Sequence, residues 1–140
     1  MNYDLERFVT EQDRDYETVL GELRRGRKSS HWIWFIFPQI AGLGHSAMSQ
    51  HFAIGSLDEA RAYLAHPVLG PRLLECADTL AGVDTADPVA VLGGIDAVKL
   101  RSSMTLFAHA AGDEETRAHF TAVLDHYFRG EEDPATLALI

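Results

Sequence analysis

The chain has 140 residues, of which 46% are hydrophobic and 24% charged, a composition that excludes a mainly disordered or fibrous protein. Twelve Lys and Arg residues against 21 Asp and Glu residues give a net charge of −9. Because so acidic a body repels phosphate groups, we expect no nucleic-acid partner and no membrane partner. The length predicts one helical domain over residues 1–140, and the single cysteine, Cys76, excludes an intramolecular disulfide and a cysteine metal cluster.

The first residues, MNYDLERFVTEQDRDYE, are acidic and have no apolar centre, so they do not resemble a signal peptide. We therefore expect a cytoplasmic protein. Apolar residues three and four positions apart then predict a helix over residues 4–25, or two helices broken near Asp13. Asp4 is the expected cap of this helix, and Gly26 lies just past its end.

Further helix signals follow along the chain. The predicted helices span residues 57–64, 69–80, 89–92, 97–111 and 114–128. Capping residues are expected at Ser56, Asp87, Asp96 and Asp133. Since no segment alternates convincingly between apolar and polar residues, the sequence predicts an all-α fold class with one compact multi-helical domain.

Residues 29–57 contain no Asp, Glu, Lys or Arg. The aromatic run within this segment, Trp32 to Phe37, is far shorter than the roughly 18 to 20 apolar residues of a membrane span. We interpret it as a buried helical turn ended by Pro38. Such a run usually belongs to the core, but the histidine, glutamine and serine residues around it favour a pocket as well, because buried polar groups need partners.

Residues 96–111, DAVKLRSSMTLFAHAA, form the second informative segment. Leu100, Met104 and Phe107 lie on one helix face, while polar residues occupy other faces. Lys99 and Arg101 on such a central helix require either a carboxylate partner or an anionic ligand. The partner would be Asp96 or an acid of the first helix, and both alternatives stay open at this point.

Several motifs together resemble the bacterial family catalogued as domain of unknown function 1810. They are GRKSSHWIWFIFPQ (26–39), GLGHS (42–46), YLAHPVLGPRL (63–73) and DAVKLRSSMTLF (96–107). The departures from the family pattern are small, with Ile33 where methionine is common and Phe52 where tyrosine is common. The resemblance implies an all-helical domain with two buried central helices, and it implies no activity.

The sequence yields two functional hypotheses. The first is a pocket that binds, or acts on, a small anionic ligand such as a carboxylate, a phosphate or a nucleotide-like molecule. The predicted ligand-binding residues are Lys28, Trp32, Trp34, Gln39, Ser46, Lys99, Arg101, Ser102 and Ser103. The predicted catalytic pair is His31, as general acid or base, with Asp96 as the nearby carboxylate.

The second hypothesis is a non-enzymatic interaction protein whose buried polar residues only fix the fold. No motif calls for a cofactor. The histidines do not form the His-x3-His zinc pattern, so we expect no metal site. The oligomeric state is open.

Overall fold

The computed structural model describes residues 3–140 and confirms the all-α fold class. This part of the chain forms nine helices and no strand, with one isolated parallel bridge between Ile40 and Ile54. The helices are α1 (Glu6–Arg25), α2 (Ile33–Ile36), α3 (Ala47–His51), α4 (Leu57–Ala65), α5 (Leu69–Ala81), α6 (Pro88–Leu92), α7 (Gly94–Ala110), α8 (Glu114–Phe128) and α9 (Pro134–Leu137).

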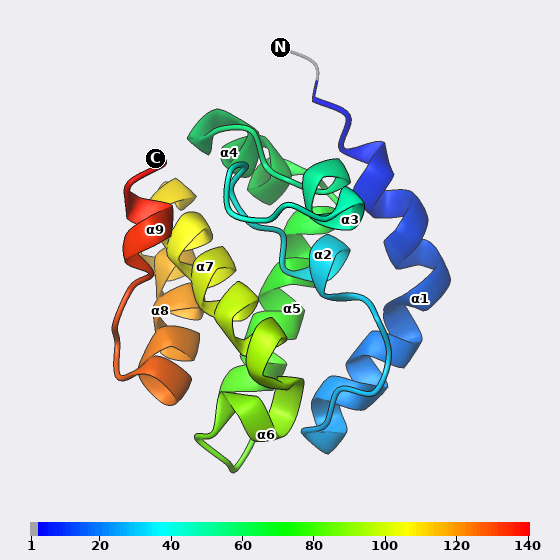
Figure 1. Cartoon of the computed structure of the whole chain (residues 1–140), viewed down its shortest axis with the longest axis vertical. Coiled ribbons are helices and arrows are strands. Elements are labelled where there is room, and N and C mark those ends of the chain that lie inside the picture. Colours follow the sequence, from blue (N-terminus) through cyan, green and yellow to red (C-terminus); the bar gives the residue numbers. More distant parts are fainter. Residues whose placement is uncertain (1–2) are drawn as a thin grey trace.

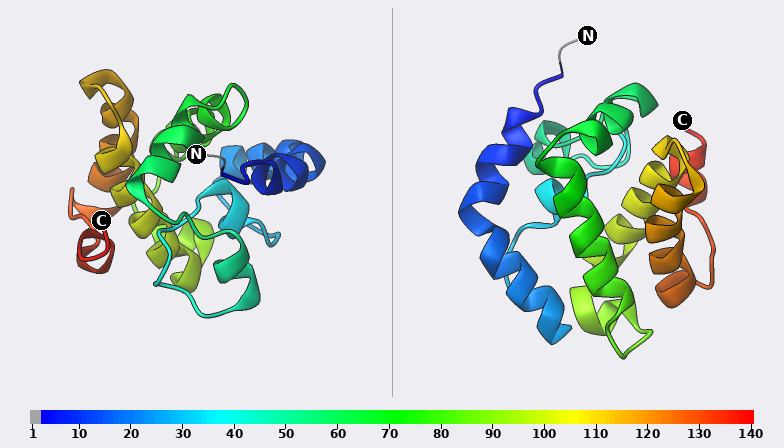
Figure 2. Two further views of the ribbon diagram at one scale, coloured as in Figure 1. Left: turned by 90° about the horizontal axis from the view of Figure 1, so that it is seen from above. Right: turned by 180° about the vertical axis from the view of Figure 1, so that it is seen from behind.

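Helix α7 is the centre of the arrangement, and it packs against α2, α4, α6, α8 and α9. In Figure 1 it crosses the middle of the molecule, with α1 at one edge and α8 and α9 at the other. Figure 2 shows the same separation of α1 from α8 from above and from behind. The chain therefore surrounds α7 with other helices, which explains why its apolar residues are not confined to one face.

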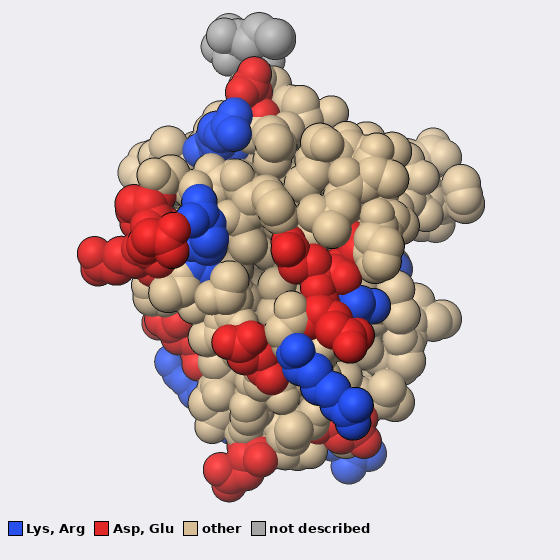
Figure 3. Space-filling model, turned by 90° about the vertical axis from the view of Figure 1, so that its left-hand side faces the viewer, with Lys and Arg blue, Asp and Glu red and all other residues tan. Residues whose placement is uncertain are grey.

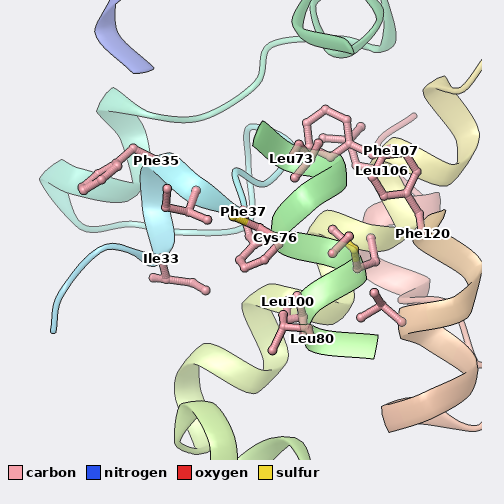
Figure 4. Packing of buried hydrophobic residues seen from close by; sticks show 14 of the residues in the cluster. Ile33, Phe35, Phe37, Leu73, Cys76, Leu80, Leu100, Leu106, Phe107 and Phe120 are labelled. Atoms are coloured by element: carbon pink, nitrogen blue, oxygen red, sulfur yellow. The ribbon is translucent and has the colours of Figure 1, made fainter. Parts of the chain in front are cut away.

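The predicted core of α7 is confirmed, because Leu100, Met104 and Phe107 are fully buried. Helix α2 forms the second buried element, as expected for the aromatic run, and Pro38 follows its end. Figure 4 shows Leu73, Cys76 and Leu80 of α5 in the middle, with Leu100 of α7 beside Leu80, Ile33 and Phe35 of α2 on one side, and Phe107 of α7 and Phe120 of α8 on the other. One continuous hydrophobic cluster thus joins the two buried helices that the sequence singled out.

Three of the predicted caps form as expected. The side chain of Ser56 accepts a hydrogen bond from the N–H of Glu59 at 3.2 Å, and Asp87 accepts one from Val89 at 3.0 Å. Asp133 in the same way caps α9. Each carboxylate or hydroxyl satisfies one of the N–H groups that a helix start leaves without an intrahelical partner.

The first helix differs from the prediction at its start. Asp4 does not cap it, because the capping position is Leu5, which offers no side-chain hydrogen bond. Of the two alternatives for the rest of this segment, one continuous helix is confirmed, because α1 runs without a break past Asp13. The carboxylate of Asp13 lies 2.8 Å from a guanidinium nitrogen of Arg72 on α5. At the other end, Gly26 adopts the left-handed conformation (φ 70°) expected of a helix-ending glycine.

Among the described residues, no helix combines the length and the apolar character that crossing a bilayer requires.

Replacing Phe107 with Ala tests the assignment of the core. The side chain is fully buried and contacts the rings of Tyr63 and Phe120, with ring centroids 5.2 and 5.9 Å away. We expect the variant to lose about 3 to 5 kcal/mol of unfolding free energy in a denaturant titration. Val98→Ala is the matched control on the same helix, because Val98 is exposed, and its effect should stay within about 0.5 kcal/mol. Equal losses for the two variants would contradict the core assignment.

Candidate functional site

A cavity of about 610 Å³ lies where the loop after α1, the start of α2 and the start of α7 meet. Its lining includes six of the residues that the sequence predicted as binding or catalytic. They are Lys28, His31, Trp34, Ser46, Asp96 and Lys99. These residues come from segments up to about seventy positions apart in the sequence, so only the folded chain brings them together.

The loop from α1 to α2 is fixed by one buried carboxylate, that of Glu22. This side chain accepts hydrogen bonds from the N–H groups of Ser29 (2.6 Å) and Ser30 (2.9 Å). It also accepts one from the Ser30 hydroxyl (2.6 Å) and one from the indole N–H of Trp32 (3.0 Å). Four donors therefore converge on a side chain that is only 2% exposed.

Burial by itself would raise the pKa of the Glu22 carboxyl, because the charged form loses its hydration. The hydrogen bonds from Ser30, Ser29 and Trp32 outweigh burial and lower this pKa from 4.5 to about 2. Glu22 is therefore ionised at neutral pH. The loop that carries Lys28 and His31 is held in place before any ligand arrives.

A second contact fastens the same loop to the other side of the cavity. The N–H of Lys28 donates to the carbonyl oxygen of Val91 in α6 at 2.7 Å. The ammonium of Lys28 lies 2.8 Å from a carboxylate oxygen of Asp96, and the two side chains are only 8% and 18% exposed. This ion pair lies in the lining of the cavity and connects the loop after α1 to α7.

The start of α7 lies elsewhere than the sequence predicted. We expected Asp96 to cap a helix beginning at Ala97, but the capping residue is Gly93 and the helix begins at Gly94. The prediction was wrong because Asp96 already lies in the first turn, where its carboxylate binds Lys28. The N–H groups of Gly94, Ile95 and Asp96 donate no hydrogen bond to another described residue. They leave a helix start with a partial positive charge at the cavity.

Lys99 occupies the same cavity, one turn further along α7. Its ammonium has no carboxylate within 4.0 Å among the described residues. It lies instead over the ring of Trp34, 4.9 Å from the ring centroid. The sequence left two alternatives open for Lys99, a carboxylate partner within the protein or an anionic ligand. Among the described residues, the carboxylate partner is absent.

His31 and Ser46 complete the predicted lining. The His31 side chain is exposed and makes no hydrogen bond with another described residue. The Ser46 hydroxyl caps α3 by accepting from the N–H of Ser49 at 3.1 Å. Helix α3 was not predicted, because its segment is short, uncharged and without apolar periodicity.

Two predicted aromatic or amide residues lie away from the cavity. Trp32 is only 1% exposed and uses its indole N–H for Glu22, so it supports the loop from behind. Gln39 lines a separate, smaller cavity of about 200 Å³ beside Gly42 and Gly44. The prediction that both residues face the same ligand pocket was wrong.

Arg101 and Ser102 also lie elsewhere, and both hold the C-terminal segment. Arg101 donates to the carbonyl oxygens of Glu131 (2.9 Å) and Glu132 (2.8 Å). The hydroxyl of Ser102 donates to the carboxylate of Asp133 at 2.7 Å. Burial opposes ionisation of Asp133, but hydrogen bonds from Thr136 and Ser102 lower its pKa below the ordinary range. The expectation that these two residues share the cavity with His31 was wrong.

Ser103 is fully buried on α7, and its hydroxyl has no hydrogen-bond partner among the described residues. It does not line the cavity. The polar residues of the 96–107 motif thus separate into those that face the cavity and those that do not. Arg101 points away from Lys99, because residues two positions apart on a helix point about 200° apart. Ser102 and Ser103 are buried one turn further along the helix and do not line the cavity.

Sequence reasoning missed Glu22, Ser29, Ser30, Gly93 and Gly94. For Glu22 a signal was present, because it lies three positions after Val19 on the apolar face of α1 and so had to be buried. A carboxylate on a buried face implies donors nearby. Gly93 and Gly94 were likewise a signal, because glycine is one of the residues that commonly precede a helix.

Among residues 3–140 no group of three or more His, Cys, Asp and Glu side chains is arranged to hold a metal ion.

The family model described as a protein of unknown function (DUF1810) matches residues 2–140. The chain belongs to this family. It is also similar to a solved structure described as the conserved hypothetical protein Rv1873 from Mycobacterium tuberculosis. The two share 46% sequence identity and a TM-score of 0.94, over 99% of this chain and 96% of that chain. No curated protein matches the chain. The family and the similar structure bear out the resemblance, and neither description states an activity.

Substitution of Glu22 with Gln tests the role of the buried carboxylate. Because the pKa of Glu22 is lower in the folded state, its stabilisation is fully present above about pH 4.5 and is lost as the pH falls toward 2. At neutral pH we expect Glu22→Gln to have an unfolding free energy on the order of 2 to 3 kcal/mol below that of the wild type. This difference between the variant and the wild type should become smaller as the pH falls. Denaturant titrations at neutral pH and at about pH 3 measure both effects. The exposed Glu17→Gln variant on the same helix is the control, and identical pH profiles for the two variants would refute the role.

A pair of lysine variants tests the difference between the two ammonium groups. Lys28→Met leaves the carboxylate of Asp96 without its partner, so we expect it to cost about 1 to 3 kcal/mol of unfolding free energy. Lys99→Met leaves no carboxylate unpaired, and its cost should stay below about 1 kcal/mol. Chemical denaturation of both variants in one buffer makes the comparison. A larger loss for Lys99→Met would show a carboxylate partner that the structure does not contain.

Proposed function

We propose that the cavity between the loop after α1 and the start of α7 binds a small anionic molecule, a phosphate or a carboxylate. The observation that carries the proposal is the ammonium of Lys99, which faces the cavity without a carboxylate partner. Lys99 is only partly buried, and an anion that enters the cavity can bind its ammonium without breaking an ion pair.

The charges around the cavity support this choice. Lys28 and Lys99 are the only lysines of the chain, and both line this one cavity. Asp96 balances Lys28, so the ammonium of Lys99 remains uncompensated. The N–H groups at the start of α7 add partial positive charge on the same side. The ionised carboxylate of Glu22 lies behind Ser29 and Ser30, but four hydrogen bonds already satisfy it, so Lys99 is the charged lining group without a polar partner.

His31 gives the cavity a group for proton transfer. It is the imidazole in the lining, the side chain that most often transfers protons in catalysis, so it is our candidate for a general acid or base. Asp96 contributes a carboxylate that Lys28 keeps in place. In this proposal a reaction on the bound anion uses His31 for the proton and Asp96 for electrostatic support.

The acidic net charge disfavours a nucleic-acid partner, and we place the protein in the cytoplasm on the evidence of its sequence. On the side of the molecule shown in Figure 3, acidic side chains form several groups with Lys and Arg side chains between them. That side presents no continuous basic surface of the kind that tracks a phosphate backbone.

The alternative function is an interaction protein without a ligand. It is favoured by Arg101 and Ser102, which were predicted to bind a ligand and instead fix the C-terminal segment. Under this alternative, the polar groups around Lys99 serve the fold in the same way. The ligand experiment below separates the two functions.

The test is a thermal-unfolding screen with inorganic phosphate, pyrophosphate, acetate and citrate at constant ionic strength. A ligand present at about 100 times its dissociation constant should stabilise the protein by roughly 2.7 kcal/mol. We expect at least one phosphate or carboxylate to raise the unfolding temperature of the wild type and to lose this effect in Lys99→Met. Arg14→Met removes an exposed cation outside the cavity and is the control for general electrostatics. Absence of any Lys99-dependent shift would favour the interaction protein.

A further inference from the structure

The contact between Lys99 and Trp34 shows what each side chain offers to the cavity. The ammonium of Lys99 lies 4.9 Å from the centroid of the Trp34 ring. The indole nitrogen of Trp34 is buried and has no partner among the described residues. Trp34 thus presents ring surface to the cavity and no hydrogen-bond donor. The ammonium of Lys99 occupies that ring surface.

A lysine at position 99, rather than an arginine, favours a side chain that can change its contact when a ligand binds. The chain has ten arginines, and none of them lines the cavity. An arginine stacks flat on an aromatic ring and binds carboxylates and phosphates in a two-pronged planar fashion. A lysine is a compact charge on a flexible four-carbon chain with three rotatable donors, and it binds a phosphate as a point charge. Its attraction to an aromatic face is weaker than a charge-assisted hydrogen bond to a phosphate oxygen.

We propose that the ligand is a phosphate monoester that carries a planar aromatic ring, and that Lys99 couples the binding of its two parts. When the phosphate binds, the ammonium leaves the Trp34 ring for the phosphate oxygens. The ring of the ligand then takes the vacated place against Trp34. This inference rests on the proposed function, because it assumes that the anion binds at Lys99.

The surroundings of Lys99 give both parts of such a ligand room. Ile95 lies four positions before Lys99, so both residues face the same side of α7, and both line the cavity. A Cβ atom added at Gly93 or Gly94 would meet nothing within 4 Å, so the space in front of the helix start is open. A cavity of about 610 Å³ is also far larger than a phosphate ion alone requires.

The experiment compares four probes on the full chain. Adenosine 5′-monophosphate has both parts, glycerol 3-phosphate has only the phosphate, adenosine has only the ring, and benzoate joins a ring to a carboxylate. Calorimetry gives the dissociation constants. We expect the nucleotide to bind at least about tenfold more tightly than glycerol 3-phosphate, in line with the usual strength of base stacking on an aromatic side chain. Adenosine and benzoate should bind more weakly still.

Tryptophan fluorescence reports the ring contact directly. The chain has two tryptophans, and Trp32 is buried with its indole N–H bound to Glu22, so a change on binding reports Trp34. We expect the nucleotide to change the emission and glycerol 3-phosphate to change it less. Trp34→Phe, which keeps a ring, should lose the signal and keep the binding. Lys99→Met should weaken the nucleotide at least about tenfold, whereas Arg14→Met should not.

The outcomes separate this inference from the proposed function. Equal affinity for the nucleotide and glycerol 3-phosphate, with unchanged emission, would overturn the ring contact. Benzoate binding as tightly as the nucleotide would overturn the preference for phosphate. Both results would leave anion binding at Lys99 intact. Nucleotide binding that Lys99→Met leaves unchanged would place the ligand elsewhere and overturn the coupling. If none of the anions binds the wild type, the proposed function itself fails.

Discussion

The buried carboxylate of Glu22 is the constraint on which the candidate site depends. An ionised group that is 2% exposed would be costly if it stood alone, and four hydrogen bonds from the following loop offset that cost. The loop cannot move without stranding this charge. Lys28 and His31 are consequently presented from a fixed frame, and the second anchor at Val91 fixes that frame relative to α7. Such preorganisation lowers the entropy that a ligand must overcome on binding.

Helix α7 combines two environments within one element. Its first turns face the cavity with glycines, Asp96 and Lys99, whereas its later turns supply Leu100, Met104 and Phe107 to the core. A third side, with Arg101 and Ser102, holds the C-terminal segment. The rigid core therefore positions the cavity directly, because both belong to the same helix. This arrangement also explains why a single motif in the sequence contains residues with unrelated tasks.

The distribution of charge gives the cavity its character. The protein carries a net charge of −9, yet its only two lysines lie together in one cavity. One lysine is paired with Asp96 and joins two segments of the fold, while the other rests on an aromatic ring. The paired lysine serves stability, and the unpaired one is available to an anion. The two lysines therefore differ in what the ammonium of each one contacts.

The sequence by itself determined the helical class, the two buried helices and most of the caps, because these depend on local periodicity and on side chains a few residues away. It also singled out six residues that the fold places in one cavity. Whether Asp96 caps a helix or binds Lys28 was decided only by tertiary structure, as was the place of Arg101 and Ser102 beside the C-terminal segment. The reason is physical: a polar side chain takes its role from the partner that packing brings to it, and that partner lies far away in the sequence.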